Sequence, residues 1–327
     1  MDLVALIGSE TPLGREVRDV LNEAGLGKAV RLIGSSDTES VLAQDEGELT
    51  VLSQLDETEL ADADVIVNAA AGGVAAKAHA MTPSTPLIDL TGELEGQPSA
   101  RIRCPILENG TAAAGNPLIV AHSAATALAL LLRRIQKSFP IAHAVAQVFE
   151  PVSERGASGI HELQSQVTSL LSFKPLTKDI FDAQVAFNLL PAYGEEAQSR
   201  LGDSQDRLER HLATVLAGQT PMPSVRLIHA PVFHGHAGSL WIEFETRPGV
   251  VELEQALATA QIDVRSEGTE PASNVGIAGI SGVVAGPVES DPHHPRACWI
   301  WFAADNYRLA ADSAVTLVRA ILQGDDA

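Results

Sequence analysis

The stretch LVALIGSETPLG, residues 3–14, predicts how the chain begins to fold. Its first five residues form a short apolar run that is typical of a buried strand, and a glycine-bounded turn follows at once. The next segment, residues 15–24, places Val17, Val20 and Leu21 on one face, as an amphipathic helix does. This order of strand, glycine turn and helix predicts the first unit of a parallel sheet with helices packed on it.

Three further apolar runs repeat this pattern. Residues 30–33, 65–71 and 86–90 are each short and apolar, and each is followed by glycines or small polar residues. A parallel sheet wound by helices binds its ligands beyond the carboxyl ends of its strands, where these small residues lie. The sequence therefore predicts an α/β fold whose N-terminal domain, residues 1–125, is a Rossmann-type dinucleotide-binding domain.

The pattern changes after residue 140, where strands and longer helices alternate differently. We expect an α+β domain over residues 126–304 and a C-terminal helix over residues 305–327 that returns to the first domain. In the second domain, strands are expected at 141–149, 224–233 and 239–244, and helices at 159–172 and 203–217.

Composition excludes several classes of function. The 327 residues carry a net charge of −20, which argues against nucleic acids and anionic membranes as partners. The longest apolar run, Ala124–Leu132, is too short to span a bilayer, and the N-terminus lacks the pattern of a signal peptide, so we expect a cytoplasmic protein. Cys104 and Cys298 form no disulfide framework, and no Cys/His spacing predicts a metal site.

The glycine turn after the first strand has two interpretations. Its backbone N–H groups and the following helix N-terminus could face a phosphate, as in dinucleotide sites. However, Thr11 stands where such sites usually have glycine, and Glu10 would repel a pyrophosphate. A cofactor site and a purely structural turn both remain open from the residues alone.

Several short motifs, taken in order, resemble the aspartate-semialdehyde dehydrogenase family over nearly the whole chain. The spacing between them, more than any single motif, is what resembles the family. They are Ile7-Gly8 with Leu13-Gly14, Ile33-Gly-Ser-Ser36, Ala69-Ala-Ala-Gly-Gly73, Ser153-Glu-Arg-Gly-Ala-Ser-Gly159, His161-Glu-Leu163, Ala186-Phe-Asn-Leu-Leu-Pro191, Ala230-Pro-Val-Phe-His-Gly-His236 and Asp305-Asn306.

The resemblance implies an NADP-dependent oxidoreductase of amino-acid biosynthesis that forms homodimers through its second domain. Family members convert aspartyl-4-phosphate to the semialdehyde through a cysteine thioester, which accepts hydride from NADPH while a histidine acts as acid and base. Sulfur suits this chemistry because a thiol is easily deprotonated and its thioester is an activated acyl group. The cofactor-binding positions carried over are Gly8, Thr11, Gly14, Ser35, Ser36, Gly72, Gly73 and Asn306.

This sequence departs from the family pattern at the nucleophile. The cysteine position falls on Ala124, within Ala121-His-Ser-Ala-Ala-Thr126. Ser123 with His122 is a weak substitute, because adjacent side chains rarely face each other and an oxygen ester is a poorer intermediate. His236 keeps the family's acid/base position, although a packed histidine near a strand end is an equal alternative.

Positions that bind anions in the family also differ. Glu150 replaces a glutamine that helps to hold the acyl intermediate, and His229 replaces the arginine that binds the substrate carboxylate. Glu95 and Asp37 fall where arginines bind phosphates, and a carboxylate there reverses the electrostatics. Arg207 is the one remaining candidate for a basic group that faces the substrate.

Two hypotheses follow from these residues. The favoured one is a non-catalytic dimeric homologue whose binding of NADP is in doubt; its partners would be a second copy of the chain and a nucleotide. The alternative is a functional but divergent aspartate-semialdehyde dehydrogenase, or another NAD(P)-dependent oxidoreductase. Two residues can each be interpreted in two ways. Asn306 could cap the C-terminal helix instead of binding a nicotinamide. Trp299 could belong to the core or to a dimer surface.

Overall fold

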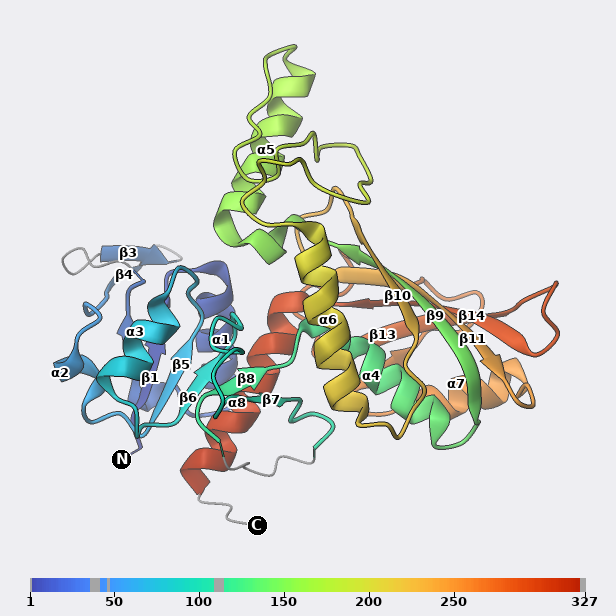
Figure 1. Ribbon diagram of the computed structural model, residues 1–327, viewed down its shortest axis with the longest axis horizontal. Helices are drawn as coiled ribbons and strands as arrows, with labels where there is room; N and C mark the ends of the chain where they lie inside the picture. The colour runs from blue at the N-terminus through green and yellow to red at the C-terminus, as the bar shows by residue number, and fades with distance from the viewer. Residues whose placement is uncertain (1, 36–41, 46–47, 109–114, 324–327) are drawn as a thin grey trace. The chain divides into compact units, whose positions relative to one another are not determined.

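The computed structural model describes residues 2–35, 42–45, 48–108 and 115–323 (Figure 1). The chain divides into two compact units, one made of residues 1–121 with 310–327 and the other of residues 122–309. The domain boundaries expected from the sequence remain a prediction about independently folding domains.

The first unit contains a six-stranded sheet in the order β2-β1-β5-β6-β8-β7, and every neighbouring pair is parallel. The central strand β1 is buried along its whole length, as its apolar sequence predicts. This sheet confirms the predicted Rossmann-like α/β fold. The strands are β1 (Val4–Ile7), β2 (Val30–Ile33), β5 (Val65–Asn68), β6 (Leu87–Asp89), β7 (Arg101–Arg103) and β8 (Leu118–Val120).

Helices cover both faces of this sheet. Apolar residues of α1 (Pro12–Glu23) and of the later part of α8 (Asn306–Gln323) share one core with the sheet. Residues of α2 (Glu57–Leu60) and α3 (Val74–Met81) form the core on the other face. A short helix, η1 (Gly27–Ala29), precedes β2, and strands β3 (Leu42–Asp45) and β4 (Glu48–Val51) form an antiparallel pair.

Helix α1 begins at Pro12, three residues before the helix expected from apolar spacing. Thr11 is its N-cap: the Thr11 hydroxyl oxygen accepts a hydrogen bond from the Gly14 N–H at 2.9 Å. A threonine cap followed by proline is a favoured helix start, because it satisfies free N–H groups and presets the backbone. Leu13 continues the apolar spacing of Val17, Val20 and Leu21 into the first turn and packs on the same core, so the expected start at residue 15 is three residues too late.

The second unit contains a mixed six-stranded sheet in the order β10-β9-β11-β14-β13-β12. Strands β9 and β10 are parallel, whereas β11 pairs antiparallel with both β9 and β14. The strands are β9 (Ile141–Glu150), β10 (Ser224–His229), β11 (His236–Phe244), β12 (Ile262–Val264), β13 (Val283–Ser290) and β14 (Ala297–Ala304).

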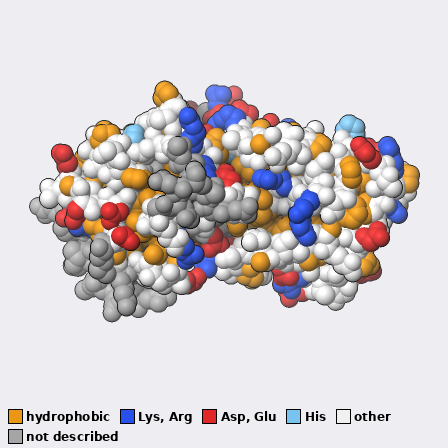
Figure 2. All heavy atoms as spheres, turned by 90° about the horizontal axis from the view of Figure 1, so that it is seen from below, with side chains coloured by type: hydrophobic (Ala, Val, Ile, Leu, Met, Phe, Trp, Pro, Cys, Tyr) orange, Lys and Arg blue, Asp and Glu red, His pale blue; other side chains and the backbone are white. Residues whose placement is uncertain are grey.

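Helices α4 (Ser123–Gln136), α6 (Leu201–Leu216) and α7 (Val250–Leu257) pack with this sheet, and η2 (Val152–Arg155) leads into α5 (Gly156–Leu171). The apolar run Ala124–Leu132 lies inside α4 and is buried in the protein. Within the described residues, no helix combines the length and the apolar character that a membrane span requires. On the face drawn in Figure 2, acidic and basic side chains are scattered among neutral and hydrophobic ones.

Candidate functional site

A cluster of buried polar side chains lies in the second unit, where four elements come together. His122 precedes α4, Glu154 lies in η2, His236 begins β11 and Asn306 begins α8. His122, His236 and Asn306 are at most 6% exposed. The fold therefore gathers two imidazoles, a carboxylate and an amide from distant parts of the chain.

The carboxylate of Glu154 is the centre of this cluster. Its Oε1 lies 3.2 Å from Nε2 of His236, and its Oε2 lies 3.6 Å from Nε2 of His122. The side-chain amide of Asn306 donates a hydrogen bond to Oε1 at 2.9 Å. One carboxylate thus contacts both histidines and is held in place by a third side chain.

The pKa values of Glu154 and His122 are lowered, whereas the pKa of His236 is raised. Burial opposes ionisation of Glu154, but His236, His122 and Arg155 beside it hold the pKa of its carboxyl well below its usual range. Burial also opposes the charge on His236, yet its contact with Glu154 and the nearby Glu150 raises the pKa of this imidazole. Burial lowers the pKa of His122 to about 3, so this ring is neutral near pH 7.

Asn306 does not cap helix α8. The neighbouring Asp305 takes that role, because its Oδ1 accepts hydrogen bonds from the N–H groups of Tyr307 and Arg308 at 3.0 and 3.1 Å. The Asn306 amide instead donates to Glu154, and its oxygen accepts from the Gly235 N–H at 2.9 Å. Its expected contact with a nicotinamide remains a prediction.

Ala124 lies in the first turn of α4 and is fully buried. Its N–H donates a hydrogen bond to Nδ1 of His122 at 3.2 Å, while the Ser123 hydroxyl donates to the main-chain oxygen of Asn306 at 2.7 Å. The hydroxyl of Ser123 and the ring of His122 thus have different partners. This arrangement does not favour a serine nucleophile activated by His122.

The cysteines lie elsewhere. Cys298, the one cysteine of residues 122–309, is on β14, six residues before Ala304, which pairs with His236. At about 3.3 Å per strand residue, this separates Cys298 from His236 by roughly 20 Å. Burial also raises the pKa of the Cys298 thiol to about 12. Cys104 is fully buried in the first unit.

A second buried cluster forms at the ends of β9 and β10, where Glu150 and His229 are in register. The Arg155 guanidinium lies 3.1 Å from Oε1 of Glu150, and the Tyr193 hydroxyl donates to the same oxygen at 3.3 Å. Tyr193 also lies 3.1 Å from Nδ1 of His229. Burial, which Arg155 opposes, raises the pKa of Glu150, and burial lowers that of His229 to about 4.

Helix α6 contributes two residues beside the first cluster. The His211 Nδ1 accepts a hydrogen bond from the main-chain N–H of His122 at 2.8 Å. Arg207 lies near enough for its charge to help lower the pKa of His122. The structure thus places Arg207 in the neighbourhood of the cluster, and its role toward a substrate remains a prediction.

The side chain of Thr11 forms hydrogen bonds within the glycine turn of the first unit. The Thr11 hydroxyl donates to the Gly8 oxygen at 2.8 Å while it accepts from the Gly14 N–H. A Cβ at Gly8 would lie 2.6 Å from the Cβ of Ala70, and one at Gly14 would lie 2.0 Å from the Gly8 oxygen. Close backbone approach therefore accounts for both glycines, whether or not a cofactor binds there.

Two carboxylates accept hydrogen bonds from residues that the resemblance assigns to cofactor binding. Glu93 accepts hydrogen bonds from the Gly72 N–H at 2.5 Å and from the Gly73 N–H at 3.0 Å. Glu10 accepts from the N–H and the hydroxyl of Ser35. Ser36 and Asp37, which the sequence also singled out, lie outside the described residues.

Sequence reasoning did not single out Glu93, Glu154, Arg155, Tyr193 or His211. Glu154 and Arg155 do lie inside the quoted motif that begins at Ser153, so their charges were visible without a known role. The contacts of the others join residues 21 to 89 positions apart, which no local pattern reveals.

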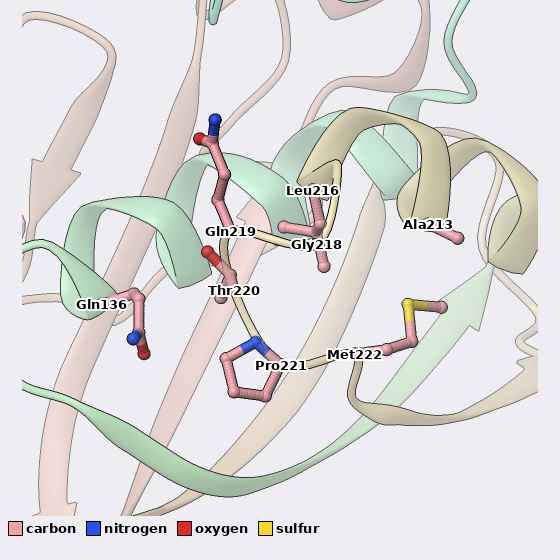
Figure 3. Close-up of a pocket in the computed structure, with 8 residues that line it drawn as sticks. All are labelled: Gln136, Ala213, Leu216, Gly218, Gln219, Thr220, Pro221 and Met222. Atoms are coloured by element: carbon pink, nitrogen blue, oxygen red, sulfur yellow. The ribbon is translucent and has the colours of Figure 1, made fainter.

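One open depression, of about 570 Å³, lies between the C-terminal ends of α4 and α6 (Figure 3). It is lined by Gln136, Ala213, Leu216 and residues 218–222, none of which carries an ionisable side chain. The predicted site residues lie outside it.

Comparisons with known proteins agree with this architecture. Residues 132–309 match the family model described as semialdehyde dehydrogenase, dimerisation domain. The aspartate-semialdehyde dehydrogenase of Rickettsia bellii is 23% identical over 317 residues, which cover 94% of each chain.

Solved structures share the fold. A probable aspartate-semialdehyde dehydrogenase from Pseudomonas aeruginosa has a TM-score of 0.83 and 24% identity, with 99% of each chain covered. The aspartate semialdehyde dehydrogenase of Candida albicans, solved with NADP, has a TM-score of 0.64 and 17% identity, with 100% of this chain and 99% of that chain covered. Because the family model spans more than half of its 327 residues, the chain belongs to the semialdehyde dehydrogenase family.

Proposed function

We propose that this chain is a non-catalytic, homodimeric member of the family that does not form an acyl thioester. The observation that carries the proposal is Ala124 at the motif position of the nucleophile, in the first turn of α4. Cys298 cannot substitute for it, because it lies six strand residues from the partner of His236 and its thiol has a pKa of about 12. A thiolate is the species that attacks, and a methyl group has no such form.

The residues around the proposed substrate site support the same conclusion. The arginine position of the family is His229, whose pKa of about 4 makes it neutral near pH 7. The one guanidinium in this cluster, Arg155, pairs with the buried Glu150 of this chain. A substrate carboxylate would therefore meet a neutral imidazole and an arginine that already has a carboxylate partner.

We further propose that NADP binds weakly or not at all. Glu93 places a carboxylate on the Gly72 and Gly73 N–H groups, and Glu10 places one on Ser35. These residues do not fit a phosphate, since a second anion would have to displace or repel the first. The Candida albicans relative was solved with NADP, so the loss would be a property of this chain.

The proposed dimer would use the outer face of the second sheet. Trp241 faces both Trp299 and Val145 across neighbouring strands. Trp299 is 37% exposed and Val145 is 38% exposed, so apolar surface is left on this face. Aromatic side chains are enriched in interfaces, and these strands lie within the segment that matches the dimerisation domain.

The test of this proposal combines catalysis and binding. Phosphate-dependent reduction of NADP by aspartate semialdehyde is expected to stay at the uncatalysed rate, and calorimetry is expected to detect no submicromolar NADP binding. A rate clearly above background would support the divergent dehydrogenase instead. NADP binding without turnover on this substrate would favour an oxidoreductase that transfers hydride without a covalent intermediate, for which His236 and Glu154 keep an acid/base pair.

A further inference from the structure

We infer that His122, Glu154 and His236 form a binding site for one divalent transition-metal ion, with zinc as the best-fitting cation. The three side chains can each offer one ligand atom, and these atoms all lie within 4.8 Å of one another. The two histidine-to-carboxylate separations are 3.2 and 3.6 Å. Ligands about 2.0 to 2.2 Å from a tetrahedral zinc ion are separated by comparable distances.

The state of His236 gives independent support. This ring is fully buried, and its contacts with Glu154 and with the main chain of Phe149 do not form well-aligned hydrogen bonds. Its Nε2 is directed at Glu154 but contacts it in poor alignment. A buried polar atom whose hydrogen bonds are poorly formed is costly, and coordination to a cation would satisfy it.

The donor set selects the class of metal. Two imidazole nitrogens and one carboxylate oxygen are the ligands of many catalytic zinc sites and of non-haem iron sites. Calcium and magnesium prefer shells of oxygen ligands, which this cluster does not supply. Three protein ligands would leave one position for water or for an oxygen atom of a small ligand.

Neighbouring groups hold the ligands in position. Asn306 donates to Glu154 Oε1 and accepts from the N–H of Gly235, the residue before His236. The Tyr307 hydroxyl donates to the main-chain oxygen of Ser153, the residue before Glu154. Hydrogen bonds of this kind orient the ligands of metal sites and contribute to affinity.

Binding would move protons in a defined way. His122 accepts the Ala124 N–H through Nδ1, so its neutral ring carries a proton on Nε2. For Nε2 to coordinate, that proton moves to Nδ1 and the 3.2 Å bond to Ala124 is lost. Coordination by His236 requires a ring nitrogen that carries no proton, so uptake of the metal is expected to release protons and to lower the pH of an unbuffered solution.

Other ionisable groups around the cluster affect its charge balance. Glu150 and Arg155 act on His236 or Glu154, while Arg207 and His211 act on His122. Arg155 pairs with Glu150, and the carboxylate of Glu154 contacts the two imidazoles, so a cation bound between them would take over these contacts. The inference does not depend on the proposed loss of catalysis, because none of the ligands is Ala124.

The experiment uses the full chain without an affinity tag, stripped with a chelator and then titrated with Co²⁺ and Zn²⁺. One equivalent of Co²⁺ is expected to give the visible absorption bands of a tetrahedral or five-coordinate site. Zn²⁺ should bind with proton release, measured by calorimetry in two buffers of different ionisation enthalpy. E154Q and H236Q should each weaken binding by about 100-fold or more, and N306A by about 10-fold.

H293Q and H143Q are the matched controls, because both histidines are exposed and lie outside the cluster. They should bind the metal as the unchanged protein does. Binding that is lost in H293Q but kept in E154Q would overturn the inference, as would the lack of one stoichiometric site in the unchanged protein.

Folding of each variant is checked by circular dichroism. If E154Q and H236Q do not fold, X-ray absorption of the cobalt-loaded unchanged protein decides the question. Two imidazoles in the cobalt shell support the inference, and a shell with fewer than two refutes it.

Discussion

Replacing His229 with glutamine should make the stability of the second unit less sensitive to acid. His229 is fully buried, and burial, with Arg155 nearby, lowers its pKa to about 4. In the unfolded chain the pKa of His229 is about 6.5. Between about pH 6.5 and pH 4 the unfolded ring is therefore protonated while the folded ring is neutral, so unfolding is accompanied by uptake of a proton. The folded state therefore loses stability as the pH falls from about 6.5 to about 4.

The magnitude follows from these two pKa values. Between pH 7 and pH 5 the unfolded histidine becomes almost fully protonated while the folded one remains mostly neutral. Linkage then predicts that His229 lowers the free energy of unfolding by about 2 kcal/mol over this interval. Glutamine does not titrate, so H229Q should remove this part of the pH dependence, whatever it does to stability at pH 7.

Urea unfolding at pH 5, 6 and 7, followed by tryptophan fluorescence at one protein concentration, measures this effect. All three tryptophans lie on β11 and β14 of the second unit, so the signal reports the unit that contains His229. H293Q, in which an exposed loop histidine away from this sheet face is replaced, is the control and should keep the pH dependence of the unchanged protein. Equal pH dependence in H229Q and the unchanged protein would refute the assignment of a neutral buried imidazole.

Four further predictions test the proposals. A124C should remain nearly inactive in the aspartate-semialdehyde assay, because the neutral His229 stands at the position that the resemblance assigns to a substrate-binding arginine; activity within about 100-fold of a cysteine-containing relative would contradict this. W299R should shift the protein from dimer to monomer in analytical ultracentrifugation, and an unchanged sedimentation coefficient would rule out this face. E93A should raise NADP affinity about 10-fold by freeing the Gly72 and Gly73 N–H groups, and calorimetry that shows no gain would dismiss Glu93 as the obstacle. G8A should destabilise the first unit by about 1 to 3 kcal/mol, since its φ is +75° and a Cβ would lie 2.6 Å from Ala70; an unchanged urea midpoint, followed by far-UV circular dichroism, would exclude such strain.

The cluster that carries the metal inference shows where sequence reasoning stops. His236 was identified through a motif, and Asn306 through another, but their common partner Glu154 was one charge among 42 acidic residues. The three proposed ligands, His122, Glu154 and His236, are separated by 32 and 82 positions, so their spacing in the chain predicts no metal site. Main-chain hydrogen bonds from Val152 and Ser153 to Val232 and Phe233 bring Glu154 beside the start of β11, and the pairing of β11 with β14 brings the start of α8 there.

The amino-acid sequence by itself determined the parallel first sheet, since short apolar runs ending at glycines suffice to predict strands buried on both faces. It also predicted alanine at the position that the resemblance assigns to the nucleophile, because that motif is local. Tertiary structure decided the rest: which carboxylate reaches Gly72, which arginine pairs with Glu150, and which imidazoles contact Glu154. The physical reason is the distance along the chain over which each kind of interaction acts. Strand and helix patterns depend on neighbours a few residues away, whereas the charge state and partners of a buried side chain depend on packing between segments far apart in the chain.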